Sequence, residues 1–397
     1  MKSILVIAFI TTLLVIPTSS NVFTASLSEH RMDERSELYF VSNERTLYVG
    51  GTGPDNYTKI QDAIDAANAG DTIFVYDDSS PYYENVVINK SINLVGENKD
   101  TTVIKGKNDN VVHIKANNAN ITGFTIQSNG STYAIIYLDH SNNANLHSLI
   151  IQFAKKGIHL LHSNNATLSN NIISKCSYGI YNLFSNSTII RENILRDNDN
   201  GVEISHSKDV QIENNNISKN NYAIFLDNSL NTSINQNLIK SNNVHAIYLF
   251  SSKHSIITGN CIDGNKWGIL IDNADDLEGY ALIQHNNISN NVVCGIQIDW
   301  SFGNKIVENN ISYNDVGIRL ISSIGAVIMK NNFFYNRRHA YFEKFIIFGV
   351  IPLNLIHGNF WGRPHIFPKI IFGILLPGNI PWIQFDLMPR LFPWRQK

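Results

Sequence analysis

Residues 201–226, GVEISHSKDVQIENNNISKNNYAIFL, contain one full turn of the repeat that determines the fold. The stretch opens with Gly201 to Ile204 and closes with Ala223 to Leu226, and both segments follow the pattern small–aliphatic–variable–aliphatic. Equivalent positions are 22 residues apart. The pattern recurs from Ile135 to Ala340 at spacings of 22, 22, 22, 22, 23, 22, 27, 22 and 23 residues. A period kept over this many units predicts a repeat protein.

The alternation inside each unit predicts a strand with one buried face. The residues one and three places after the small residue are expected to point inward, and the residue two places after it outward. The Leu-x-x-Leu-x-Leu skeleton of leucine-rich repeats is missing, although the repeat length is similar. We therefore expect an all-β protein, a single-stranded right-handed parallel β-helix, which is a solenoid of coils about 22 residues long.

Two polar columns are expected at the corners of the coils, where stacked side chains hydrogen-bond along the column. One column contains Asn residues that precede an aliphatic residue: Asn171, Asn193, Asn216, Asn237, Asn287 and Asn310. The other contains Ser residues six places after the small residue: Ser141, Ser163, Ser185, Ser207, Ser229, Ser252, Ser301 and Ser323.

The ends of the chain differ from the repeat. Lys2 precedes an apolar run from Ile4 to Ile16, which predicts a signal peptide over 1–25, with an uncleaved membrane anchor as the alternative. A linker is expected over 26–46 and the β-helix over 47–340.

Both ends of the β-helix are predicted to be capped. Thr58 and Gln61 have capping-box spacing ahead of a short amphipathic helix that covers the first coil. Residues 341–397 are rich in Pro and Trp and predict an irregular aromatic C-terminal cap or tail, with a membrane-associated tail as the alternative.

Composition restricts the function. The net charge is −2, only 16% of residues are charged, and no basic stripe occurs, so a nucleic-acid partner is not expected. No later apolar run reaches the length of a membrane span, so the chain is not expected to cross a membrane after signal cleavage. We expect a secreted or cell-surface protein.

Several motifs resemble the repeats of the NosD-type family within the pectin-lyase-like superfamily. They are Asn-x-Ile followed by Gly-Ile-x-Leu and Ser, the opening segments 60–64, 70–73 and 92–96, and the closing Asn359-Phe360-Trp361-Gly362. The resemblance covers residues 47–362 and implies a parallel β-helix. It also implies either copper handling, as for the family's namesake, or action on polysaccharides, as for superfamily relatives. The Asn-Thr-Asp and Gly-His-Gly motifs of polygalacturonases do not occur.

Aromatic residues are frequent at the outward position, which predicts a surface for a polysaccharide or glycan, including cell-envelope components. Flat rings pack on sugar C–H groups, although aromatic residues also favour strands for structural reasons. The predicted carbohydrate-binding residues are Tyr137, His159, Tyr181, Phe225 and Tyr248.

Acidic residues four places after the small residue form a second set, Asp139, Asp227, Asp272 and Asp299. Asp272 and Asp299 lie in consecutive coils near Arg319, so these three are the candidate catalytic residues. The coil between the two acids carries an insertion with Asp275, Asp276 and Glu278, which would suit Ca²⁺.

His140 and His162 occupy the same position in neighbouring coils and are the candidate metal ligands, for copper or zinc. Solvated corner histidines are the alternative. Three functions therefore remain open. They are a non-catalytic scaffold or carbohydrate-binding protein, a polysaccharide hydrolase or lyase, and a metal-handling accessory protein.

Overall fold

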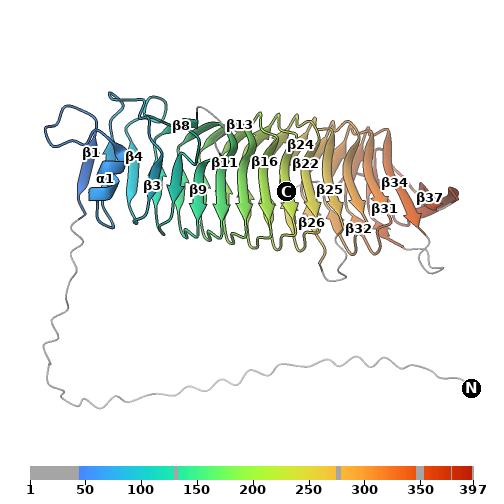
Figure 1. Cartoon of the computed structure of the whole chain (residues 1–397). Helices are drawn as coiled ribbons and strands as arrows, with labels where there is room; N and C mark the ends of the chain where they lie inside the picture. The colour runs from blue at the N-terminus through green and yellow to red at the C-terminus, as the bar shows by residue number, and fades with distance from the viewer. Residues whose placement is uncertain (1–43, 129–132, 274–278, 346–352, 377, 396–397) are drawn as a thin grey trace, which may run out of the picture. The chain divides into compact units, whose positions relative to one another are not determined.

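The computed structural model describes residues 44–128, 133–273, 279–345, 353–376 and 378–395. The predicted signal peptide (1–25), most of the predicted linker (26–46) and the acidic insertion at Asp275, Asp276 and Glu278 lie outside these residues. The described chain is a parallel β-helix, as predicted (Figure 1). Its strands stack from coil to coil into three columns, which run along the length of the solenoid.

The first column is a 14-stranded parallel sheet. Its strands are β1 (Thr46–Val49), β2 (Thr72–Val75), β4 (Asn93–Gly96), β7 (Asn120–Thr122), β10 (Asn145–His147), β12 (Thr167–Ser169), β14 (Ile189–Arg191), β17 (Gln211–Glu213), β20 (Ser233–Asn235), β23 (Ile256–Thr258), β26 (Leu282–Gln284), β29 (Lys305–Val307), β32 (Val327–Met329) and β35 (Leu355–His357).

The second column carries the repeat pattern and is called the front face below. Its strands are β3 (Val86–Ile88), β6 (Val112–Ile114), β9 (Ala134–Asp139), β11 (Ile150–Leu161), β13 (Ile172–Leu183), β16 (Asn200–Ser205), β19 (Tyr222–Asp227), β22 (His245–Phe250), β25 (Trp267–Asp272), β28 (Cys294–Asp299), β31 (Val316–Ile321) and β34 (Arg338–Phe345).

The third column shares β11 and β13 with the front face, because these two strands continue through a corner. Its other strands are β5 (Val103–Gly106), β8 (Thr125–Ser128), β15 (Ile194–Arg196), β18 (Asn216–Ser218), β21 (Leu238–Lys240), β24 (Cys261–Asp263), β27 (Asn287–Ser289), β30 (Asn310–Ser312), β33 (Asn332–Phe334) and β36 (Phe360–Trp361).

The repeat pattern has a direct packing reason. In β19, Ala223, Ile224 and Leu226 are buried, while Tyr222 and Phe225 stay partly exposed. A small residue, Gly or Ala, is favoured at this position because the backbone of the next coil approaches closely. A Cβ atom added to Gly179 would lie 2.5 Å from the carbonyl oxygen of Gly201. The inward aliphatic residues form one continuous core along the solenoid.

Two ladders of buried Asn side chains run along the corners. The first contains Asn171, Asn193, Asn215, Asn237, Asn260, Asn286, Asn309, Asn331 and Asn359. The second contains Asn198, Asn220, Asn242, Asn265, Asn291, Asn314 and Asn336. In each ladder the amide nitrogen of one Asn donates to the amide oxygen of the next, so the buried polar groups are paired.

The predicted Asn column was correct for Asn171, Asn193 and Asn237 and wrong for Asn216, Asn287 and Asn310. The last three begin strands of the third column and point outward, and the Asn directly before each of them belongs to the ladder. Asn215 keeps the 22-residue spacing to Asn193 and to Asn237, which Asn216 does not, and burial separates Asn286 and Asn309 from the Asn residues that follow them. The predicted Ser column is confirmed as buried, and from Ser141 to Ser252 the backbone N–H of each Ser donates to the hydroxyl of the next.

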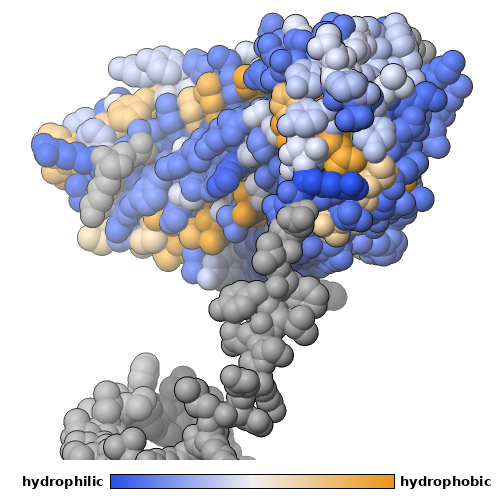
Figure 2. Space-filling view, turned by 90° about the vertical axis from the view of Figure 1, so that its left-hand side faces the viewer, coloured by the Kyte–Doolittle hydropathy of each residue, from blue (hydrophilic) through white to orange (hydrophobic). Residues whose placement is uncertain are grey.

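The first coil is covered by α1 (Ile60–Ala66), as predicted. The predicted capping box with Thr58 is wrong, since Lys59 holds the N-cap position without a side-chain cap. Glu84 takes this role from another coil, and its carboxylate accepts from the backbone N–H groups of Ile60 and Gln61 at 2.9 and 3.0 Å. Seen towards this end of the β-helix, most of the visible surface is hydrophilic, with hydrophobic residues gathered in smaller groups (Figure 2).

The C-terminal segment is more regular than the sequence pattern indicated. β34 crosses the predicted boundary between residues 340 and 341, and β35 and β36 extend the other two columns. β37 (Lys369–Leu376) then pairs in parallel with β34 and in antiparallel fashion with β38 (Ile380–Asp386). No helix in the described ranges has the length and apolar character of a membrane span.

Candidate functional site

The front face presents the outward residues in one continuous column. Strand registers place in line Tyr137, His159, Tyr181, Glu203, Phe225, Tyr248, Leu270, Gln297, Arg319 and Tyr341. Each residue comes from a neighbouring coil, so consecutive side chains are spaced roughly 4.8 Å apart. The predicted order of the column is therefore correct.

The N-terminal part of this column is filled by the protein's own side chains. The rings of His113, Tyr137, His159 and Tyr181 follow one another at centroid distances of 4.9, 5.0 and 5.1 Å. Lys156 lies beside them, with its Nζ atom 4.4 Å from the ring centroid of Tyr181. His159 is consequently only 2% exposed. Burial, with Lys156 nearby, lowers its pKa to about 3, so the ring is neutral and not accessible to a ligand.

Further along, five rings form an accessible surface that we call the aromatic platform: Tyr222, Phe225, His245, Tyr248 and Trp267. Phe225 stacks on Tyr248 at 5.1 Å, Tyr222 stacks on His245 at 5.4 Å, and His245 stacks on Trp267 at 5.9 Å. All five are partly exposed. Burial, with Lys266 nearby, lowers the pKa of His245 to about 4, so the platform carries no positive charge of its own at neutral pH.

Three of these rings were missed by the sequence pattern. Tyr222, His245 and Trp267 each stand directly before the small residue of their unit. Tyr178 holds the same position one coil before Asn200, and its ring lies 5.2 Å from that of Tyr181. An aromatic residue before the small residue in four coils was the available signal. The sequence pattern alone did not show where these side chains lie. The strand registers and ring contacts show that this position borders the outward column.

Two carboxylates adjoin the platform. Asp272 and Asp299 are register partners in β25 and β28, so the structure brings together the predicted pair. The Tyr248 hydroxyl donates to Asp272 at 3.3 Å, and the Gln297 amide donates to Asp299 at 2.6 Å. Burial, reinforced by Asp272 and Glu343, raises the pKa of Asp299 to about 6, against the opposing effects of Gln297 and Arg319.

Arg319 has a partner that the sequence pattern did not suggest. Its guanidinium forms an ion pair with Glu343 of the next coil. Arg319 is the register partner of Gln297, and Glu343 follows Asp299 in its own row, two coils on. The three predicted catalytic residues therefore lie in one area of the front face. Within this area Arg319 pairs with Glu343 and not with Asp272 or Asp299.

The two predicted metal ligands stack on each other. His140 and His162 have ring centroids 4.9 Å apart and an interplanar angle of 28°, and Phe184 continues the stack. Nearly parallel rings hold their in-plane lone pairs side by side, whereas a shared ion needs them to converge. His140 also contacts Asp139 through Nδ1 at 2.7 Å. Within the described ranges, no group of three or more His, Cys, Asp or Glu side chains is arranged to hold a metal ion.

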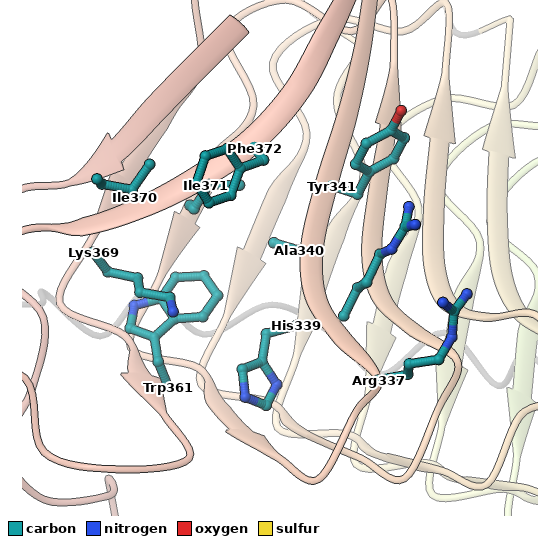
Figure 3. A pocket seen from close by; sticks show the side chains of 10 residues that line it. Arg337, His339, Ala340, Tyr341, Trp361, Lys369, Ile370, Ile371 and Phe372 are labelled. Atoms are coloured by element: carbon teal, nitrogen blue, oxygen red, sulfur yellow. The ribbon is translucent and has the colours of Figure 1, made fainter. Parts of the chain in front are cut away.

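A pocket of about 520 Å³ lies at the C-terminal end, between the last coil and β37 (Figure 3). Arg338, His339 and Tyr341 line one side, and Lys369 and Phe372 line the other. The ring of the buried Trp361 lies between the two sides. Arg337 at the rim is paired with Asp315.

Comparisons with known proteins agree with this architecture. The model of a family described as "Periplasmic copper-binding protein (NosD)" matches residues 64–253 and 242–365. A search of curated proteins gives no match.

Solved structures share the fold at low sequence identity. The catalytic unit of an α-1,3-glucanase from Streptomyces thermodiastaticus is 14% identical with a TM-score of 0.60, over 77% of this chain and 65% of that one. The Dettilon tailspike protein is 13% identical with a TM-score of 0.51, over 87% and 68%.

Proposed function

The chain belongs to the NosD family, and from this membership and the front face we propose that it is an extracytoplasmic protein that binds an extended, uncharged glycan on the aromatic platform. A cleaved signal peptide over residues 1–25 is part of this proposal, since the family description is periplasmic. The observation that carries the proposal is the platform itself. Five partly exposed rings from three consecutive coils form one surface.

The geometry of the platform suits a sugar chain. Consecutive coils repeat at roughly 4.8 Å, so a glycan that lies along the solenoid meets a new aromatic side chain at each coil of the platform. Aromatic rings offer an apolar face to sugar C–H groups and leave their edges in water. Tyr222 and His245 widen the surface beyond the single column of Phe225 and Tyr248. Among solved structures with this fold, one is named as a glucanase, which agrees with a glycan ligand.

The charges around the platform favour an uncharged ligand. The front-face strands β16, β19, β22, β25 and β28 place four acids on this face, Glu203, Asp227, Asp272 and Asp299, and contain no Lys or Arg. The nearest base is Lys266, directly before β25. Burial raises the pKa of Glu203 above its ordinary value. A polyuronate would meet like charge along this surface. We do not extend the proposal to copper, since the described residues do not bring three potential ligands together.

A pull-down on insoluble polysaccharides tests the proposal. The purified chain is mixed with neutral glucans and mannans and, in parallel, with polyuronates. We expect retention on at least one neutral polysaccharide that persists at high salt, because ring stacking is not screened by ions. Retention by polyuronates alone, or by none of the polymers, would contradict the proposal.

A second candidate function is glycoside hydrolysis at Asp272 and Asp299. The specific observation is the raised pKa of Asp299, which keeps this carboxyl protonated below about pH 6 beside a second carboxylate. Asp299 would donate a proton to the leaving oxygen as the glycosidic bond breaks, and the Asp272 carboxylate on the neighbouring coil would take a proton from the water that attacks the anomeric carbon. The platform would then hold the part of the glycan on one side of the cleaved bond.

Release of reducing ends from a retained polysaccharide checks this function. Asp299→Asn is expected to lower the rate by roughly 10²–10⁴-fold, because the amide cannot donate the proton. The rate of the unmodified chain should fall as pH rises through about 6, where Asp299 loses its proton. Asp227→Asn, at the same strand position two coils before Asp272, is the matched control and should leave the rate unchanged. Equal rates for all three proteins would exclude catalysis by this pair.

A further inference from the structure

The C-terminal hairpin exposes an apolar face. The cross-strand pairs Ile370–Phe385, Phe372–Ile383 and Ile374–Pro381 alternate with buried residues along β37 and β38. Phe372 is 68% exposed, and Ile383 and Phe385 are also exposed. An outward sheet face is normally polar, so this row is unusual for a surface in contact with water only.

The segments on either side of the hairpin also carry exposed apolar side chains. Exposed apolar residues precede and follow the hairpin in the chain: Ile366, Phe367, Leu387, Met388, Leu391 and Phe392. Of these, Ile366 is 84% exposed and Phe392 is 70% exposed. Exposed apolar side chains elsewhere in the described chain are spread over many separate coils. The concentration within residues 366–392 therefore marks an interaction surface.

The charges on this segment have one sign. Between residues 345 and 395 the basic residues are Arg363, Lys369, Arg390 and Arg395, and the one acid is Asp386. Asp386 is fully buried, where it accepts hydrogen bonds from several groups that include the indole N–H of Trp361. The exposed charge beside the apolar face is therefore positive.

The pocket beside the hairpin adds a place for an anionic group. Arg338 and Lys369 line it from opposite sides, and no ion pair with an acid is formed by either within the described ranges. The Asn336 amide donates to Nδ1 of His339 at 3.3 Å, so the proton of this neutral ring is on Nε2. Two cations and one neutral N–H donor suit a phosphate diester. Phe372 and Ile370 belong both to the pocket wall and to the apolar face.

We propose that the hairpin face docks on the surface of an anionic phospholipid bilayer. The apolar side chains of β37 and β38 enter the boundary between headgroups and acyl chains, and the pocket binds a headgroup phosphate. Interfacial binding of this kind combines buried apolar area with electrostatic attraction.

Cosedimentation with vesicles tests this proposal with the full chain. Vesicles of phosphatidylcholine alone are compared with vesicles that also contain phosphatidylglycerol. We expect partitioning onto the anionic vesicles to be at least about tenfold stronger and to weaken as salt is added. The double variant Phe372→Ser, Ile383→Ser should lower it by about tenfold or more, because two apolar side chains no longer enter the bilayer.

Controls separate the possible causes. Val292→Ser removes an exposed apolar side chain, 69% exposed, far from the hairpin in the sequence and should have no effect. The N-terminal apolar run is common to all variants, so their differences report on the hairpin alone. Arg338→Ala with Lys369→Ala should reduce the preference for phosphatidylglycerol, and excess inorganic phosphate at constant ionic strength should mimic this loss if the pocket binds phosphate.

Three results would overturn the proposal. They are equal binding to both kinds of vesicle, unchanged binding of the Phe372→Ser, Ile383→Ser variant, and concentration-dependent self-association of the unmodified chain that this variant abolishes without any vesicle binding. The last result would assign the face to a second copy of the chain. Unchanged circular dichroism of each variant shows that the fold is retained.

Discussion

Trp267→Ala is expected to weaken binding of a neutral glycan by roughly 30-fold, equivalent to about 2 kcal/mol. Trp267 lies at the end of the aromatic platform, stacked on His245 at 5.9 Å, and presents the largest apolar surface of the five rings. Its side chain points away from the core, so the free energy of unfolding should change little. Isothermal titration with soluble oligosaccharides of the retained polymer measures the effect.

Tyr313→Ala is the matched control for this prediction. Tyr313 is 57% exposed and stacks on Tyr335 at 5.0 Å, so it is also a member of a ring pair on successive coils. Its position follows β30 in the third column, away from the front face. Affinity should be unchanged in this variant. A similar loss in both variants would mean that the platform is not the binding surface.

Asp386→Ala is expected to lower the free energy of unfolding by about 3–5 kcal/mol. The Asp386 carboxylate ends the first Asn ladder and is fully buried. It accepts five hydrogen bonds, from the backbone N–H groups of Gly358, Asn359 and Met388, from the Asn359 amide and from the Trp361 indole. The alanine variant leaves the backbone N–H groups of Gly358 and Asn359 and the Trp361 indole N–H buried without this acceptor, whereas the Asn359 amide keeps the carbonyls of Ile328 and His357. The shift of the denaturant midpoint measures the loss.

Two further variants identify the cause. Asp386→Asn keeps one acceptor oxygen and should lose less than Asp386→Ala. Asp315→Ala removes an acid that pairs with the exposed side chain of Arg337, and its cost should stay below about 1 kcal/mol. If Asp386→Ala were no more harmful than Asp315→Ala, the ladder would not depend on its terminal acceptor. In a solenoid each coil contacts mainly its neighbours, so the loss should appear first in the C-terminal coils.

The candidate site shows how far a periodic sequence can be interpreted. The order of Tyr137, Tyr181, Phe225 and Tyr248 follows from the period alone, because equivalent residues of successive coils are register partners. The burial of His159 does not follow, since it depends on Lys156, three residues earlier in the same strand. The pairing of Arg319 with Glu343 likewise depends on a residue in a segment that no longer matches the repeat pattern.

The C-terminal hairpin lies outside the period, and its sequence indicated an aromatic cap or tail, with a membrane-associated tail as the alternative. β37 and β38 exist as strands because β34 offers a parallel edge and because Asp386 is anchored under the last coil. These are contacts between segments far apart in the sequence. Local pattern contains no information on them, and so the exposed apolar face became visible only in three dimensions.

The sequence by itself determined the β-helix, its coil length and the facing of each strand residue, because a buried column of aliphatic side chains requires a strict period of two within strands and of about 22 between coils. Only the tertiary structure decided which aromatic rings remain accessible, that Arg319 pairs with Glu343, and that burial raises the pKa of Asp299. These features depend on burial and on neighbours from other coils.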